Sequence, residues 1–112
     1  MSEDYRGNLI QILAEVHPSL SQTYTLEFKN SFGAVTGYLN GEIFVACGKF
    51  GFALKLSPAV IKQLFAEKNA IPLKYFDKGH IKKDYAVLSE PILADKVWLR
   101  KLIGDSIEFI GS

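Results

Sequence analysis

The segment Gly48-Lys49-Phe50-Gly51 has residue types and a spacing that could hold a phosphate group or a nucleic-acid backbone. In KH domains a G-x-x-G loop clamps nucleotides, and in P-loops a longer glycine-rich turn ending in G-K-[ST] opens a helix. Here the four residues join two apolar runs that are typical of strands, and the P-loop ending is missing. The pattern therefore favours a hairpin turn in which a glycine supplies a positive φ.

A second group of side chains that could transfer protons lies between Asp77 and Asp84, whose carboxylates flank His80. Such a histidine could exchange protons with a carboxylate at the rim of a pocket between sheet and helices. The same composition is typical of a polar hairpin loop with solvated charges, which we favour. Two functions stay open on this stretch. They are a small-ligand site or enzyme at Asp77, Lys78 and His80, and nucleic-acid binding through Lys78, Lys82 and Lys83.

The two histidines and the single cysteine do not form a pattern typical of a metal site, so from the sequence we predict no metal site, no cofactor and no catalytic residue. His17 and His80 are far apart in the sequence, and neither lies in an H-x-x-x-H or C-x-x-C context. A zinc site needs three or more protein ligands. Cys47 lies in an apolar run, where a cysteine acts as a small core side chain. We therefore expect a protein that is not an enzyme.

Composition limits the partners and the compartment. The 112 residues include 13 Lys and Arg and 12 Asp and Glu, interleaved along the chain, for a net charge of +1. Direct nucleic-acid binding is therefore not favoured, because it normally needs a clustered basic excess. There is one cysteine, and the N-terminus has neither the basic nor the apolar region of a signal peptide. With no apolar run long enough for a bilayer, we expect a cytoplasmic protein without a membrane partner.

The elements that must position these residues follow from hydrophobic periodicity. Helical spacing predicts helices over residues 4–16, from Ser57-Pro58 to about residue 69, and from about Asp95 to Ile110. Alternating or apolar runs predict strands at 23–28, on both sides of Asn40-Gly41, after Gly51, and in two short stretches around 77–80. The order is α, three or four strands, α, two strands, α. It indicates one domain over residues 1–112, an α+β fold of two layers with a mainly antiparallel sheet.

The two turns also predict the register of the sheet. A two-residue turn at Asn40-Gly41 pairs Gly37 with Phe44 and Thr36 with Val45, and a turn at Lys49-Phe50 pairs Val45 with Leu54. Alternation then divides the side chains between two faces. The predicted core face carries Tyr38, Ile43, Val45, Cys47, Phe52, Leu54 and Leu56, and the opposite face carries Val35, Gly37, Leu39, Glu42, Phe44, Ala46, Ala53 and Lys55.

That opposite face is the candidate interaction surface. Phe44 would stand among the small residues Gly37, Ala46 and Ala53 as a shallow apolar patch, and such a patch needs a cover. Either the first or last helix of the same chain covers it, or a protein partner does. A second copy in a homodimer would be the commonest partner.

Between Phe28 and Ile110 the chain resembles the N-terminal domain of the TfoX/Sxy competence regulators. The resemblance rests on turn and core residues, and on "KKDYAVLSEP" followed by a helix with Trp98. The matching positions in the first half are Phe32-Gly33, Tyr38-Leu39, Asn40-Gly41, Ile43-Phe44-Val45 and Leu54-Lys55-Leu56. Ser31 stands where the family usually has Met, and Asn30 where a basic residue is common.

This resemblance implies a fold like that of secretion chaperones, with residues 1–112 as one TfoX N-terminal-like domain. Full-length competence regulators add a helical C-terminal domain, and the family has no established catalytic residues to carry over. The expected function is a stand-alone, non-enzymatic regulatory or protein-interaction module. The small-ligand or enzyme reading near His80 and the nucleic-acid reading remain its alternatives.

Overall fold

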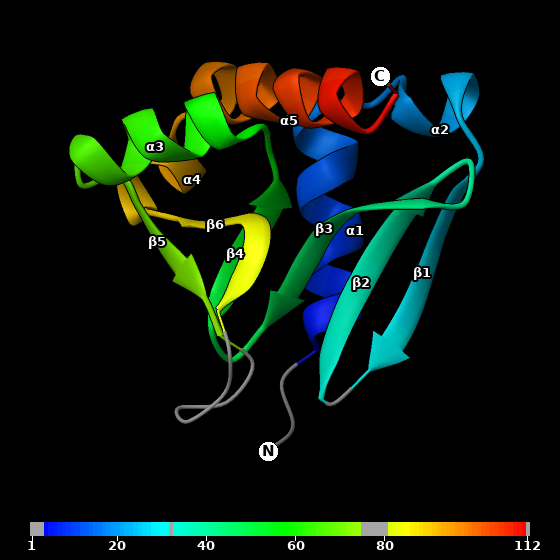
Figure 1. Ribbon diagram of the computed structural model, residues 1–112. Coiled ribbons are helices and arrows are strands. Elements are labelled where there is room, and N and C mark those ends of the chain that lie inside the picture. Colours follow the sequence, from blue (N-terminus) through cyan, green and yellow to red (C-terminus); the bar gives the residue numbers. More distant parts are fainter. Residues whose placement is uncertain (1–3, 32, 75–80, 112) are drawn as a thin grey trace.

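The computed structural model describes residues 4–31, 33–74 and 81–111 and shows an α+β fold (Figure 1). The sequence predicted this fold class and the order of its main elements. The elements are α1 (Tyr5–Val16), α2 (Leu20–Thr23), β1 (Leu26–Ser31), β2 (Ala34–Leu39), β3 (Glu42–Gly48), β4 (Gly51–Lys55), α3 (Pro58–Ala66), β5 (Ala70–Leu73), β6 (Lys82–Leu88), α4 (Glu90–Ala94) and α5 (Lys96–Ile110). The short helices α2 and α4 were not predicted.

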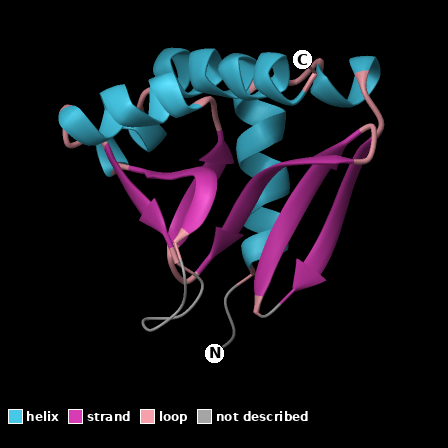
Figure 2. Cartoon of the chain, viewed as in Figure 1, coloured by secondary structure: helices cyan, strands magenta, loops and turns pink. Residues whose placement is uncertain are grey.

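The strands form one six-stranded antiparallel sheet in the order β1-β2-β3-β4-β6-β5. The helices pack on one face of it: α1 against β2 and β3, α5 against β3 and β4, and α3 against β5 and β6. Figure 2 shows the resulting helical and strand layers. The main buried cluster lies between them and draws side chains from α1, α3, α4, α5 and the strands.

Side-chain caps define where the three longer helices begin. The carboxylate of Asp4 accepts a hydrogen bond from the Gly7 N–H at 2.8 Å, and that of Asp95 accepts from Val97 and Trp98 at 3.1 Å each. Ser57 caps α3 ahead of Pro58, through a longer bond of 3.4 Å from the Val60 N–H. These caps satisfy N–H groups that have no partner inside the helix. The sequence predicted Ser57 and Asp95 as caps, and for the first helix it offered Ser2 or Asp4.

The Asn40-Gly41 turn has the geometry predicted for it. Asn40 has φ +51° and Gly41 φ +85°, both in the left-handed region that a type I′ turn requires. Leu39 pairs with Glu42 and Tyr38 with Ile43 on either side of the turn. Asn40 also accepts a hydrogen bond on its side-chain oxygen from the Thr25 N–H at 2.8 Å, which fastens the turn to the start of β1.

Beyond this turn the predicted register is wrong by one residue. A β-bulge lies next to Tyr38, so that Gly37 pairs with Val45 instead of Phe44, and Thr36 with Ala46 instead of Val45. A bulge adds one residue to one strand and reverses the alternation beyond it. The β3–β4 hairpin keeps the predicted pairs Val45–Leu54 and Cys47–Phe52. The error is therefore confined to β2 and the start of β3.

The bulge changes which residues face the helices. Val35 and Leu39, predicted for the opposite face, belong to the main buried cluster, whereas Tyr38 does not. Phe44 belongs to that cluster with 0% of its surface exposed, and its carbonyl accepts a hydrogen bond from Ser106 Oγ on α5 at 3.4 Å. Two consecutive residues, Phe44 and Val45, thus contribute to the helix-covered core. The sequence had placed them on opposite faces.

Candidate functional site

The predicted interaction surface is not accessible in the folded chain. Phe44, Ala46 and Ala53 each expose 0% of their surface, and Gly37 is buried. Phe44 lies under the helix layer, as in the alternative in which the same chain covers it. Gly37 lies against Val45, Phe44 and Phe28. Of the four residues, only Ala46 and Ala53 are on the sheet face away from the helices. The folded chain itself therefore buries all four residues, so they form no open patch on its surface.

The sheet face away from the helices carries one cross-strand row that runs from edge to edge. Its middle is buried: Thr36 is 4% exposed and Val87 6%, on either side of the two alanines. The Thr36 hydroxyl donates to the Lys29 carbonyl at 3.3 Å and lies 3.2 Å from the Tyr38 hydroxyl. The row reaches solvent only at its ends. In spatial order it is Lys29, Thr36, Ala46, Ala53, Val87 and Ile71.

A groove of about 430 Å³ between α3 and the start of β6 is the better candidate site. This volume is within the range of ligand pockets, about 300–1,000 Å³. Helix α3 supplies a stripe at i, i+3, i+4 and i+7, which lies on one face of a helix. The stripe is Pro58, Ile61, Lys62 and Phe65, and the other wall is Ile81, Lys82, Lys83, Asp84 and Tyr85.

A second irregularity in the sheet shapes the β6 wall. The pairing with β5 jumps from Pro72–Ala86 to Leu73–Lys82. Within this jump Asp84 adopts φ +68°, an uncommon conformation for a residue with a side chain. Its carbonyl accepts a hydrogen bond from the Leu56 N–H at 2.8 Å. The strand therefore leaves the regular ladder where it faces α3.

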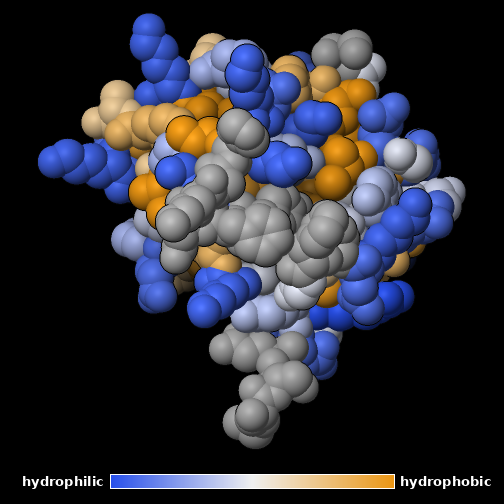
Figure 3. Space-filling view, turned by 60° about the horizontal axis from the view of Figure 1, so that its bottom comes forward, coloured by the Kyte–Doolittle hydropathy of each residue, from blue (hydrophilic) through white to orange (hydrophobic). Residues whose placement is uncertain are grey.

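The groove combines an apolar lining with a basic rim. Ile81 is 54% exposed, and Ile61, Phe65 and Tyr85 are half-buried, so apolar surface is available to a ligand. The lining also includes three lysines and one carboxylate. On the face in Figure 3, apolar side chains likewise reach the surface in separate patches bordered by polar ones. An anionic ligand with apolar groups is complementary to this lining.

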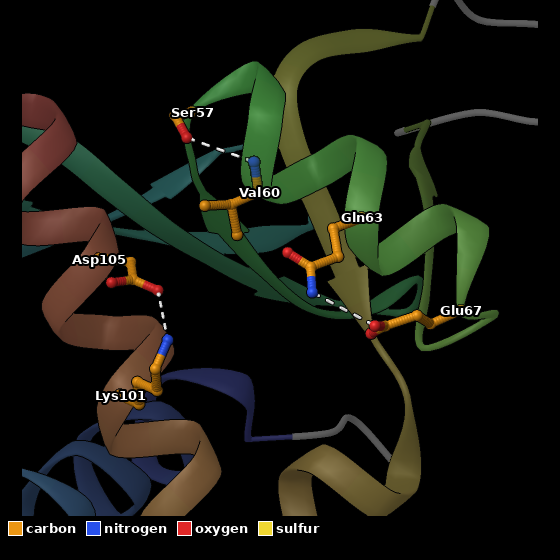
Figure 4. A network of polar contacts seen from close by, with 6 residues as sticks. All are labelled: Ser57, Val60, Gln63, Glu67, Lys101 and Asp105. Carbon is orange, nitrogen blue, oxygen red and sulfur yellow. Dashed lines mark hydrogen bonds and ion pairs between the residues drawn. The ribbon is translucent and has the colours of Figure 1, made fainter.

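Local polar contacts lie within α3 and within the neighbouring helix α5. Figure 4 shows the Ser57 cap on the Val60 N–H, and Gln63 donating to Glu67 at 3.3 Å along α3. On α5, the Lys101 ammonium is 3.5 Å from the Asp105 carboxylate. These contacts leave Lys62 exposed at the groove rim. Each contact therefore stabilises its own helix, and none of them uses a lysine of the groove.

The other residues that the sequence suggested as functional do not lie together in one site. Lys82 and Lys83 are in the groove, whereas Asp77, Lys78 and His80 lie outside the described residues. The Gly48–Gly51 segment is the predicted turn: Gly48 pairs with Gly51, Gly51 has φ +117°, and Lys49 is exposed. Cys47 is 7% exposed and lies below a hollow of about 330 Å³ between α1 and this turn.

The described residues bring together no group of three or more His, Cys, Asp or Glu side chains that could hold a metal ion. None of the helices in the described part of the chain is long and apolar enough to span a membrane.

Comparison of the chain with protein-family models and with curated proteins finds no match. The resemblance to the TfoX/Sxy N-terminal domain therefore rests on the turn and core residues quoted above. The α3–β6 groove, with its apolar and basic lining, is the candidate binding site. From the sequence, Lys82 and Lys83 were candidate binding residues, whereas the α3 wall was not predicted as part of a site. The α3 wall could have been found from the helical spacing of Pro58, Ile61 and Phe65, which places these apolar residues on one face of the helix.

Proposed function

We propose that the protein is a non-enzymatic interaction module that binds an acidic segment of a partner protein in the α3–β6 groove. The observation that carries the proposal is the lining of this groove, in which Lys62 and Lys83 stand beside Ile61, Phe65 and Ile81. Acidic side chains of the segment would pair with the lysines, and its leucine or phenylalanine side chains would cover the apolar lining. A regulatory role, as the resemblance implies, and a cytoplasmic location, as the composition predicts, are part of this proposal.

The charge arrangement also supports a peptide over a nucleic acid. Three lysines at one groove are a small basic surface, and the net charge of the chain is only +1. Phosphate binding draws its affinity from many Lys and Arg contacts. An acidic peptide with apolar anchors needs fewer charges, because burial of the anchors adds roughly 25 cal/mol per Å² of apolar surface.

Fluorescence anisotropy tests the proposal with a labelled peptide in which Asp and Glu alternate with Leu and Phe. Lys83→Glu should weaken binding by about five- to thirtyfold. An exposed ion pair contributes at most about 1 kcal/mol, and reversal replaces attraction with repulsion of similar size. Lys49→Glu makes the same change in net charge at the β3–β4 turn and is the matched control. It should leave the affinity unchanged.

Ile81→Ser tests the apolar part of the groove separately. Ile81 is 54% exposed, so the fold should tolerate the change while peptide binding weakens. Absence of binding to the wild type at low salt would overturn the proposal, and so would equal losses in Lys83→Glu and Lys49→Glu. A single-stranded oligonucleotide that binds more tightly than the peptide, and loses affinity steeply with salt, would favour the nucleic-acid alternative instead.

A further inference from the structure

Strand β1 leaves one edge of the sheet without a partner strand among the described residues. It is six residues long, from Leu26 to Ser31, and pairs only with β2. Figure 1 shows it as the outermost strand on the side away from β5. An edge of this length exposes a row of backbone N–H and C=O groups that can pair with another chain.

Hydrogen bonds between Thr25 and Asn40 show which backbone groups of β1 point outward. The Thr25 carbonyl accepts a hydrogen bond from the Asn40 N–H at 2.9 Å, and the Thr25 N–H donates to the Asn40 side chain, so both groups point toward β2. Orientation alternates along a strand. The N–H and C=O groups of Leu26, Phe28 and Asn30 therefore point away from the sheet.

We propose that β1 pairs antiparallel with β1 of a second copy, about a two-fold axis at Phe28. In this register Phe28 lies opposite its own counterpart, and Leu26 lies opposite Asn30 of the other copy. All of these residues direct their backbone groups outward, so each pair can exchange two hydrogen bonds. The sheets of the two copies would join into one continuous sheet.

Charge selects this register over its neighbours. Along β1, Glu27 and Lys29 flank Phe28, and both side chains are exposed. Pairing about Phe28 places Glu27 of each copy opposite Lys29 of the other. A two-fold axis at Glu27 would place glutamate opposite glutamate, and an axis at Lys29 would place lysine opposite lysine. Like charges directly opposite destabilise a strand pair, and opposite charges stabilise it.

The helix-covered side of the same edge gives a second, independent reason. Tyr24, Leu26 and Phe28 pack against the main buried cluster but are only partly buried themselves. Their apolar surface therefore continues to the edge of the sheet. In the proposed register Phe28 of the second copy would lie directly opposite Phe28 and diagonally to Leu26, so each copy would cover apolar surface of the other in the self-complementary arrangement of a two-fold dimer.

Sedimentation velocity over a dilution series measures the dimer dissociation constant. Glu27→Lys and Lys29→Glu should each weaken the dimer by roughly ten- to a hundredfold, because symmetry converts two favourable pairs into two repulsive ones. The double variant Glu27→Lys/Lys29→Glu restores opposite charges across the axis and should restore the wild-type constant. Glu42→Lys has the same charge change as Glu27→Lys on an exposed residue away from this edge and is the control.

Asn30→Pro tests the backbone pairing separately, because proline removes an N–H that points outward and leaves the β2 ladder intact. This variant should be monomeric, with a circular dichroism spectrum like that of the wild type. A wild type that stays monomeric at its highest soluble concentration would overturn the proposal. A double charge reversal that dimerises no better than the single variants would also overturn it. Peptide binding in the α3–β6 groove is measured separately and can succeed or fail independently.

Discussion

Replacement of Gly37 by alanine is the sharpest test of the observed register. A Cβ atom on Gly37 would lie 2.6 Å from Val45 Cγ1, 3.4 Å from Phe44 Cε1 and 3.5 Å from Phe28 Cε1. The first distance is far below van der Waals contact, and the atom it meets belongs to a buried β-branched side chain, which has few alternative rotamers. Gly37→Ala should therefore strain the core at the bulge.

The expected loss is about 1–2 kcal/mol of the free energy of unfolding. Overpacking a well-filled core costs typically 1–3 kcal/mol. The lower entropy of the unfolded chain with alanine returns about 0.4–1 kcal/mol. Val45→Ala alone should cost about 2–3 kcal/mol, because it removes two buried methyl groups at about 0.8 kcal/mol each and leaves a cavity.

The double variant Gly37→Ala/Val45→Ala isolates the contact. Truncation of Val45 removes the atom that the new methyl group would meet, so the losses of the two single variants should sum to about 1–3 kcal/mol more than the loss of the double variant, which is the overpacking cost. Urea unfolding monitored by circular dichroism measures all the differences. An unaltered stability of Gly37→Ala, or losses that add within about 0.3 kcal/mol, would show that Gly37 does not face Val45.

Three further outcomes are expected. Ser57→Ala should destabilise the protein by about 0.5–1 kcal/mol, because it removes the cap of α3. Ser89→Ala should be neutral or slightly stabilising, since the buried Ser89 hydroxyl at the start of α4 has no hydrogen-bond partner among the described residues; equal losses in urea unfolding would contradict this difference. Cys47, 7% exposed, should react with a thiol reagent only at the rate at which the protein opens, and fast labelling of the native state would contradict its burial. At the β3–β4 turn, Lys49→Ala should change stability by no more than about 0.5 kcal/mol. Gly51→Val should cost more because Gly51 has φ +117°, and so should Gly48→Val because a Cβ atom on Gly48 would lie 3.0 Å from Ala34 Cβ; a glycine variant as stable as Lys49→Ala in thermal unfolding would contradict that reading of the turn.

Local chemistry explains which parts of the fold were predictable. The caps Asp4, Ser57 and Asp95 and the turn Asn40-Gly41 act over a few residues, so residue types alone indicated the helix starts and the hairpin. The β3–β4 pairs were right for the same reason, because a short turn fixes its neighbouring register. Helices α2 and α4 were missed because they are only four and five residues long, too short to show a period.

The bulge beside Tyr38 could not be inferred from a pattern of alternation. The two predicted registers agreed with each other, but that agreement assumed unbroken alternation from one turn to the next. In the structure, Phe44 and Val45 both enter the helix-covered core, and Gly37 leaves the space that Val45 occupies. Packing against α1 and α5, which is set by residues distant in sequence, decides this local geometry. The candidate interaction surface failed because it depended on the assumed alternation.

The α3–β6 groove depends on tertiary structure in a similar way. Its basic residues Lys82 and Lys83 were noticed in the sequence, where they looked like part of a solvated loop. Their place in the groove requires α3 to pack against β5 and β6 and the ladder to break at Asp84. An aspartate can adopt a positive φ at modest cost, but nothing in the sequence requires it to do so at this position. The break in the β5–β6 ladder at Asp84 therefore places Lys82 and Lys83 at the rim of the groove, although the sequence pattern was typical of a solvated loop.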